Sequence, residues 1–405
     1  FRAPHAPMQC LYRHTVHFAD RPPIETVAIH AARGIVAVVE AHAGVRLYPS
    51  TAMTRDILAD ADNTQEPSLL VDQVGVISVK ASFAKFHPTR PLLALGVKNC
   101  VTVYNVDVPS QPKQVLVQRP DVGDVQDVGW SGDWLWVLDD SSTLRVAAGG
   151  LVQDPAKDLQ TLAASIVAAA GSPDDRHLAA VFDSKVLVYE LPSKEPLSTV
   201  VIPIAATGVA WFQTGTQDRL VLSGQGQVYI CSLDANMQGS MQKLEGLPEI
   251  SPDQEKEEES TRVSVQYDLH LGALVLGLGW DMNLRVFQEK DGQFVLVNFE
   301  ETGGVDPTLC KWGTYEEQYP WALQWDCSCA LNIPNKNPAE EPYPASILIC
   351  CLTHDMDLHI FSLYDQNAKA IHPRVAEFSA RPTGTEGSPQ ALSPIPPSMR
   401  DRPPA

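Results

Sequence analysis

Short apolar runs separated by tight polar turns recur along most of this chain. The clearest pair of copies is Leu278 to Phe287 and Leu352 to Phe361, in which the order Asp-Met-polar-Leu-basic-apolar-Phe repeats almost position for position. Period-two apolar patterns bounded by Gly, Pro, Asp and Ser are typical of half-buried β-strands joined by turns. The pattern therefore predicts a series of strand hairpins.

Five more worn copies align with this pair: Ile35 to Tyr48, Leu92 to Tyr104, Trp134 to Val146, Leu178 to Tyr189 and Leu220 to Cys231. A further strand precedes each copy. The ends of the middle copies lie 42 or 43 residues apart, which matches the roughly 40–45 residues of a four-stranded propeller blade. The sequence predicts an all-β fold, a seven-bladed β-propeller, with first strands near Ile24, Val79, Val125, Ile166, Val209, Val263 and Trp321.

In degenerate form, the repeats resemble the WD-repeat (WD40-like) family over roughly residues 24 to 363. The resemblance rests on the turns Ser172-Pro173-Asp174-Asp175 and Phe86-His87-Pro88, and on third strands of the form Asp-x-x-x-apolar-x-aromatic. No repeat has the family's Gly-His before its first strand, and Tyr, Phe, Val or Cys stands where the family has Trp-Asp. The resemblance implies a propeller whose His–Asp–Ser/Thr–Trp hydrogen-bond network is incomplete in most blades.

The chain divides into an N-terminal segment (1–23), the propeller (24–365) and a Pro/Ser-rich tail (366–405), whose composition predicts disorder. The last repeat has no obvious fourth strand. The orphan run from Met8 to Phe18 is predicted to supply it, as the outer strand that closes the ring, and Arg374 to Phe378 is the alternative. Closure matters because a closed ring leaves only short, protected sheet edges.

Few helices are expected. The sequence predicts short ones at Thr54 to Asp60 and Asp158 to Ala164. Long loops are predicted at Ala52 to Pro67, Asp234 to Thr261 and Pro334 to Pro344.

The charge balance is acidic, with 30 Lys and Arg against 49 Asp and Glu and a net charge of −19. Direct nucleic-acid binding is not expected, because it needs a basic surface and the densest charged run here is the acidic one from Asp253 to Glu259. That run has two interpretations. Its carboxylates Glu255, Glu257, Glu258 and Glu259 bind basic partners, or they form a solvated loop that keeps the protein soluble.

The eight cysteines do not form a secreted disulfide framework. Cys100, Cys231, Cys350 and Cys351 lie in apolar strand runs, where thiols behave as small core residues. Cys327 and Cys329 are separated by one residue instead of the two of a zinc knuckle, so no metal site is expected. The pattern favours an intracellular location, cytoplasmic or nuclear, and no run approaches the ~20 apolar residues of a membrane span. Because the chain begins with Phe1, a segment removed before it would be invisible.

No motif of a known catalytic class is present, and neither a cofactor nor a small-molecule substrate is expected. His354 and His359 share a repeat, but His354 occupies the place of Trp280, which argues for a structural position. Asp139, Asp140, Asp183, Asp281 and Asp355 fall at equivalent places in their repeats, as scaffold residues do. Nothing in the sequence excludes carboxylates gathered at one mouth of the channel.

Tryptophans are the other candidates for partner contact, since exposed aromatics form interface hot spots while buried ones pack between blades. Trp134 and Trp136 alternate in phase and should share a buried face. Trp130, beside a turn, and Trp312 are the candidates for exposed partner-binding residues, with core packing as the alternative for the group.

Three functions stay open at this point. The favoured one is a non-catalytic protein–protein interaction scaffold, a subunit of a larger complex. The second is an accessory subunit of a nucleic-acid machine, such as an RNA-modifying enzyme or the nuclear pore, and a basic surface patch would favour it. The third is a propeller-fold hydrolase, which needs convergent carboxylates or histidines at a channel mouth.

Overall fold

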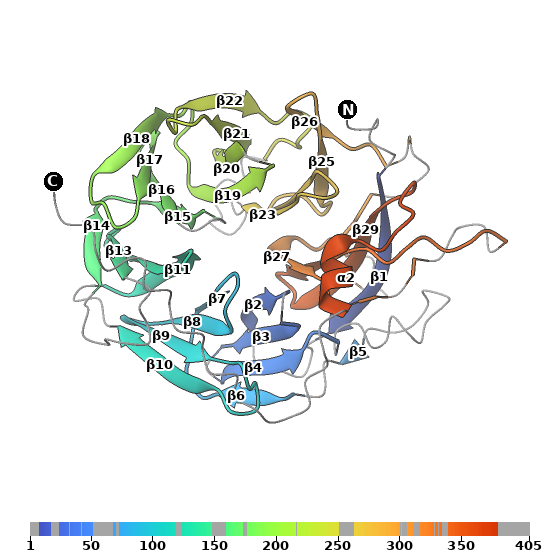
Figure 1. Cartoon of the computed structure of the whole chain (residues 1–405), viewed down its shortest axis with the longest axis horizontal. Coiled ribbons are helices and arrows are strands. Elements are labelled where there is room, and N and C mark those ends of the chain that lie inside the picture. The colour runs from blue at the N-terminus through green and yellow to red at the C-terminus, as the bar shows by residue number, and fades with distance from the viewer. Residues whose placement is uncertain are drawn as a thin grey trace, which may run out of the picture.

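In the computed structural model of the chain, seven β-sheets surround a central opening (Figure 1). The structure describes residues 8–17, 24–31, 33–41, 43–51, 68–69, 73–118, 123–147, 159–172, 176–215, 217–250, 263–299, 301, 306–311, 316–327, 329–330, 332–333 and 339–379. Within these residues, six sheets have four strands and one has five. The predicted seven-bladed β-propeller is confirmed. We number the blades 1 to 7 in the chain order of their inner strands.

Each blade is an antiparallel meander that runs from the central opening outward. The inner strands are β2 (Ile24–His30), β7 (Phe83–Phe86), β11 (Val125–Ser131), β15 (Ala168–Gly171), β19 (Gly208–Thr214), β23 (Val263–Asp268) and β27 (Pro320–Asp326). The second strands are β3 (Ile35–Glu40), β8 (Leu92–Val97), β12 (Trp134–Asp139), β16 (His177–Phe182), β20 (Gln217–Gly224), β24 (Ala273–Leu278) and β28 (Leu348–Thr353).

The third strands are β4 (Gly44–Pro49), β9 (Cys100–Asn105), β13 (Leu144–Ala147), β17 (Lys185–Glu190), β21 (Gln227–Leu233), β25 (Arg285–Lys290) and β29 (Asp357–Asp365). They contain all seven of the predicted repeat ends. The outer strands are β6 (Gly75–Ile77), β10 (Lys113–Gln118), β14 (Gln160–Ala163), β18 (Pro196–Val201), β22 (Gly239–Lys243), β26 (Gln293–Leu296) and, in blade 7, β1 (Met8–His17).

The hydrophobic core is divided among the contacts between neighbouring blades. Val186 and Val188 of blade 4, for example, are fully buried in one cluster with Trp211 and Leu220 of blade 5. The middle strands are covered on both faces, which explains why their sequences are continuous apolar runs and not strict alternations. Because every blade buries its faces against two neighbours, no blade has a complete core of its own.

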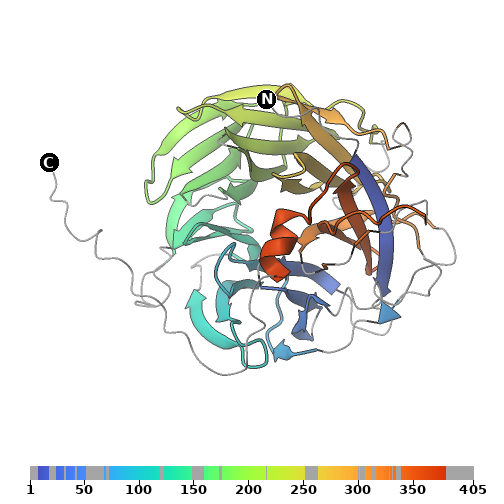
Figure 2. The same ribbon diagram turned by 45° about the vertical axis from the view of Figure 1, so that its right-hand side comes forward.

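The N-terminal strand closes the ring. β1 pairs antiparallel with β29, from Met8 opposite Asp365 to His17 opposite Asp357, so the first described segment of the chain is the outer strand of the last blade. Figure 2 shows β1, in blue, beside the red β29. This confirms the predicted closure by the N-terminal strand. The alternative run from Arg374 to Phe378 is instead part of helix α2 (Pro373–Ser379).

A fifth strand lies outside β1. The two-residue strand β5 (Ser68–Leu69) pairs with it in parallel, at Val16 and His17. Blade 7 is therefore extended by a segment that arrives from the connection between β4 and β6. The outer edge of a blade in this fold can thus accept one more strand.

Several local predictions need correction. The helix predicted from Asp158 to Ala164 is wrong, because Gln160–Ala163 form β14, which pairs with β13 and completes blade 3. Blade 2 begins its inner strand at Phe83, four residues after the predicted Val79. The loop predicted from Asp234 to Thr261 contains β22, because blade 5 also needs an outer strand. The predicted tail (366–405) contains helix α2 (Pro373–Ser379), and its remainder from residue 380 lies outside the described residues, as does the helix predicted at Thr54 to Asp60.

A buried polar network ties β1 to the rest of blade 7. The side-chain amide of Gln318 donates to Asp357 Oδ2 over 2.7 Å, which leaves Gln318 Oε1 as an acceptor 2.6 Å from His359 Nε2. His359 Nε2 therefore carries the hydrogen, and Nδ1 can accept from the Thr15 hydroxyl of β1 at 3.3 Å. This arrangement requires His359 to be neutral.

Burial lowers the pKa of His359 from 6.5 to about 4, because it disfavours the charged imidazolium, while the charge of Asp357 acts in the opposite direction. The unfolded chain takes up a proton near pH 6.5 that the folded chain does not accept until about pH 4. The contribution to stability is therefore complete above pH 6.5 and is lost as the pH falls toward 4. The gap between the two values corresponds to roughly 3 kcal/mol.

Deleting residues 1–17 should open the ring. It removes the whole β1–β29 ladder and the buried side chains of Met8, Cys10 and Val16, so the free energy of unfolding should fall by several (about 3 or more) kcal/mol. Thermal unfolding followed by circular dichroism measures this loss. Deletion of residues 1–7, which precede β1, is the matched control, and equal melting temperatures for the two deletions would contradict closure by β1.

Replacing His359 should flatten the pH dependence of stability. Between pH 7 and pH 4.5, the free energy of unfolding of His359→Asn should fall by about 2–3 kcal/mol less than that of the wild type. Urea unfolding at a series of pH values measures both curves. The control is His354→Asn, which changes the exposed histidine of the same repeat and should keep the wild-type slope. Parallel curves for His359→Asn and the wild type would show that His359 does not titrate as described.

Candidate functional site

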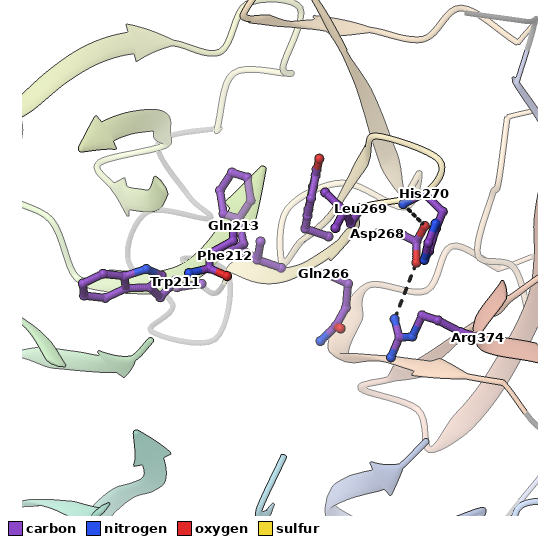
Figure 3. A pocket seen from close by; sticks show the side chains of 11 residues that line it. Trp211, Phe212, Gln213, Gln266, Asp268, Leu269, His270 and Arg374 are labelled. Carbon is purple, nitrogen blue, oxygen red and sulfur yellow. Dashed lines mark hydrogen bonds and ion pairs between the residues drawn. The ribbon is translucent and has the colours of Figure 1, made fainter. Parts of the chain in front are cut away.

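A hollow of about 450 Å³ opens between the inner strands of blades 5 and 6 (Figure 3). It is lined by Ala210, Trp211, Phe212, Gln213, Val265, Gln266, Tyr267, Asp268, Leu269, His270 and Arg374. The first four come from β19, the next six from β23 and the turn that follows it, and Arg374 from helix α2. The hollow therefore forms where the C-terminal helix meets the rim of the central opening (Figure 1).

Asp268, the last residue of β23, is the centre of this site. Its Oδ1 accepts backbone N–H groups of the turn, from His270 at 3.0 Å and Leu271 at 2.9 Å, and lies 3.1 Å from His372 Nε2. Its Oδ2 lies 3.5 Å from the guanidinium of Arg374 (Figure 3). The residue is 1% exposed. One buried carboxylate thus fixes its own turn and holds two side chains from the C-terminal segment.

These contacts keep Asp268 ionised. Burial by itself raises the pKa of a carboxyl, but the hydrogen bond and charge of His372, the N–H of Leu271 and the charge of Arg374 outweigh it, and the pKa of Asp268 is below its ordinary value of 3.8. The resulting stability is fully present above about pH 3.8 and is lost as the pH falls through the lower folded value. The Asp268 carboxylate therefore keeps its negative charge across the physiological pH range.

Helix α2 is docked by few contacts. Val375 is fully buried in the core cluster between blades 6 and 7, and the backbone N–H of His372 donates to Ala345 O. His372 also packs edge-on against His270, with ring centroids 5.2 Å apart. Pro373 suits the first turn of a helix, because its missing N–H would have no intrahelical partner there. A seven-residue helix is marginal alone, so its position depends on these contacts.

The lining of the hollow combines apolar side chains with one buried carboxylate and one arginine. Glycoside hydrolysis, as an example of propeller-fold hydrolysis, uses a pair of carboxylates. Asp268 is the one carboxylate among the residues that line the hollow, and all of its interactions named above hold structure together. What the hollow offers a ligand is apolar surface beside the half-exposed guanidinium of Arg374.

Two of the repeated acidic residues, Asp139 and Asp281, are occupied within their own blades. Asp139 Oδ1 accepts from the backbone N–H groups of Ser141 and Thr143, and Oδ2 accepts from Arg145 on the next strand. Asp281 accepts from the N–H of Asn283 and forms an ion pair with Arg285. These aspartates fix the turn between the second and third strands. Their equivalence therefore has a structural cause, as the repeat pattern indicates.

The buried ion pair between Arg219 and Glu289 joins blades 5 and 6. Arg219 is 2% exposed, its Nη2 lies 2.6 Å from Glu289 Oε1, and its guanidinium lies 5.0 Å from the ring centroid of Phe294. Removing one partner of such a pair leaves an uncompensated buried charge. The charges of this pair are therefore committed to holding two blades together.

The described tryptophans are largely core residues. Trp130 is 8% exposed and donates its indole N–H to Lys85 O, across from blade 3 to blade 2. Trp321 donates to Glu25 O and Trp325 to Tyr267 O, so both link blade 7 to a neighbour. Trp134 and Trp136 pack in one cluster, as their alternation predicts. These tryptophans therefore pack between blades, which was the alternative to partner binding. Little of Trp130 is accessible to a partner.

The other predicted partner-binding residues lie outside the described residues. Glu255, Glu257, Glu258 and Glu259 fall in the segment 251–262, and Trp312 falls in 312–315. The ends of the acidic segment are fixed. Ile250 contacts Gly226 in the turn of blade 5, and the chain resumes at Val263 as the inner strand of blade 6. The partner-binding role of these residues therefore stays a prediction.

Cys327 and Cys329 are both buried but belong to different core clusters, one between blades 6 and 7 and one between blades 7 and 1. Burial raises the pKa of the Cys327 thiol to about 12, so at neutral pH it is protonated and a poor metal ligand. Over the part of the chain that the structure describes, no group of three His, Cys, Asp or Glu side chains is placed to hold a metal ion. Within the same residues, no helix is long and apolar enough to cross a membrane.

Sequence reasoning missed Asp268, His372 and Arg374. Asp268 is the last residue of an inner strand, and nothing in the sequence distinguishes it from the carboxylates of other turns. His372 lies 104 residues away in the sequence. The only local signal was His-Pro-Arg at 372–374, which fits the start of a helix, since Pro favours the first helical turn.

Comparison with known proteins places the fold and nothing finer. No protein-family model matches the chain, and no curated protein matches it. Solved structures do match. The β-propeller domain of Myceliophteria thermophila Cps50 (Swd1) has a TM-score of 0.57 and 10% sequence identity, over 87% of this chain and 99% of that one.

Two further matches involve Nup159. Its N-terminal domain has a TM-score of 0.55 at 10% identity, and a chain from the S. cerevisiae complex of dbp5 with nup159, gle1, IP6 and ADP has 0.54 at 11%. Each covers 89% of this chain and 97% of the other. The chain therefore has the β-propeller fold of these structures, although no family model matches its sequence.

Replacing Asp268 should release helix α2. In Asp268→Ala, the hydrogen bond from His372 and the ion pair with Arg374 are lost, and hydrogen bonds to charged groups contribute about 1.5–3 kcal/mol. Amide hydrogen exchange of residues 374–379 should therefore accelerate by roughly tenfold or more. Glu377→Gln, on the exposed side of the same helix, is the control and should exchange as the wild type does. Unchanged exchange in Asp268→Ala would mean that Val375 and the backbone bond from His372 to Ala345 hold the helix without Asp268.

Proposed function

We propose that this protein is a non-catalytic protein–protein interaction scaffold, a subunit of a larger assembly. One observation carries the proposal: four buried charged residues hold the fold itself together. Asp139 and Asp281 fix turns, Arg219 joins two blades and Asp268 holds helix α2. A rigid ring of this kind frees its surface loops to vary for binding.

The comparisons support the proposal at the level of architecture. The matched propellers include Nup159, which was solved together with dbp5 and gle1, and a domain of Cps50 (Swd1). A fold shared at 10–11% identity is compatible with many functions, so support for one function has to come from the residues of the site.

We propose further that at least one partner has a basic surface. The chain carries a net charge of −19, and the run from Asp253 to Glu259 concentrates carboxylates without an apolar anchor. Complementary charge of this kind accelerates association more than it holds the complex together. The described cysteines form no disulfide with one another, and most of them are buried, which supports a role inside the cell.

Reversing the acidic run should slow association with a basic partner. The experiment begins with affinity purification and mass spectrometry, to obtain the partners. Their association rates with the variant Glu255→Lys, Glu257→Lys, Glu258→Lys and Glu259→Lys are then measured at several salt concentrations. The rate should fall by about tenfold or more at low salt, and its salt dependence should flatten, with folding intact.

A charge-matched control separates the run from the total charge. Reversal of four exposed carboxylates on other blades, Asp124, Asp140, Glu190 and Glu195, changes the net charge equally. If both variants slow association to the same extent, the run has no specific role. If purified partners bind the Glu255–Glu259 variant at the wild-type rate, the run is a solvated loop. A purification that returns no partner, together with turnover of any substrate, would contradict the scaffold role.

A further inference from the structure

The outer strand of blade 4, β18, exposes a row of uncharged, mostly apolar side chains. Leu197, Thr199 and Val201 alternate along β18 and are exposed, whereas Ser198 and Val200 on its other face are buried. Val201 is 71% exposed and Leu197 51%, among the most exposed large apolar side chains of the described residues. The buried face packs on blade 5, where Ser198 Oγ donates to Met237 O. The exposed row therefore lies on the side of the sheet that faces away from blade 5.

The backbone edge of β18 is open as well. β18 ends its sheet, and its described pairing is with β17 alone. Proteins usually protect such edges with charged residues, bulges or short strands, because an open edge is a template for another strand. From Leu197 to Val201 there is no charged residue, and β-branched residues occupy three of the five positions.

The other outer strands differ from β18. β10 and β22 each carry a lysine, and β6, β14 and β26 span three or four residues. β1 is longer, and β5 pairs with part of its edge. Blade 7 thus shows that this architecture accepts a fifth strand at its rim. Among the described outer strands, β18 is six residues long, carries no charged residue and has no further strand paired with its outer edge.

We propose that the edge of β18 is a docking site for an extended segment of a partner protein, which adds to blade 4 as a fifth strand. Main-chain hydrogen bonds to the edge would supply affinity, and alternate apolar side chains of the segment would pack on Leu197 and Val201. The segment is uncharged or basic, because an acidic segment would be repelled by a protein of net charge −19. This inference rests on the proposed scaffold function and names one class of partner for it.

A second copy of this chain is the less suitable occupant. A stable dimer buries about 800 Å² on each partner, and one five-residue strand edge supplies only a fraction of that area. Two copies would also bring two charges of −19 together. A flexible segment of another protein meets neither obstacle.

The test uses a labelled seven-residue peptide with lysine at each end and alternating threonine and valine between, and measures its binding to the full chain by fluorescence polarisation. The wild type should bind it, and amide hydrogen exchange of residues 197–201 should slow on binding. Val201→Lys and Thr199→Lys should each weaken binding by about tenfold, because both put a charge on the edge row. Val295→Lys on β26, another exposed valine of an outer strand, is the matched control and should bind as the wild type does.

A peptide of the same charge with alternate backbone N-methyl groups separates strand addition from simple electrostatic attraction, and needs no protein variant. Loss of binding with the N-methyl peptide supports the proposal, and equal binding of both peptides overturns it. Protection outside residues 196–201 also overturns it. Sedimentation that shows a dimer in the wild type but not in Val201→Lys would replace the partner segment with a second copy. The partners found by affinity purification test the scaffold role separately from these outcomes.

Discussion

The ladder between β1 and β29 is the interaction on which the rest of the structure depends. Each blade buries its two faces against its neighbours, so the core is a ring of interfaces that is complete only when blade 7 is complete. The chain solves this by using residues from its beginning and its end in one sheet. Thr15, His359 and Gln318 add a buried polar contact at that seam, which requires a neutral imidazole and so links closure to pH.

Several buried charged residues also serve to hold the structure together. In an enzyme, buried carboxylates and arginines outside structural pairs would be the first candidates for chemistry. Here Asp139, Asp281 and Arg219 act within or between blades, and Asp268 connects the inner hairpin of blade 6 to helix α2. We therefore propose that recognition falls to the surface, through the acidic run and the edge of β18.

The two proposed contacts have different physical characters. The acidic run supplies long-range attraction, which salt weakens and which acts mainly on the rate of encounter. The edge of β18 supplies short-range, directional hydrogen bonds and apolar contacts, which act mainly on how long a complex lasts. A scaffold with both could attract a basic partner and then hold an extended part of it.

The sequence by itself determined the architecture, because a repeat of strand hairpins records local preferences that each blade satisfies in the same way. The apolar runs, the turn residues and even the outer strand from Met8 could be read from it, since alternation and spacing are local properties. Only the tertiary structure decided which residues far apart in the sequence come into contact. His372 meets Asp268 across 104 residues, Gln160–Ala163 become a strand because blade 3 needs an outer one, and Arg374 enters a helix because β1 already fills the seam. Each of these outcomes depends on which partner surface is left unpaired once the ring has formed, and no local pattern encodes that.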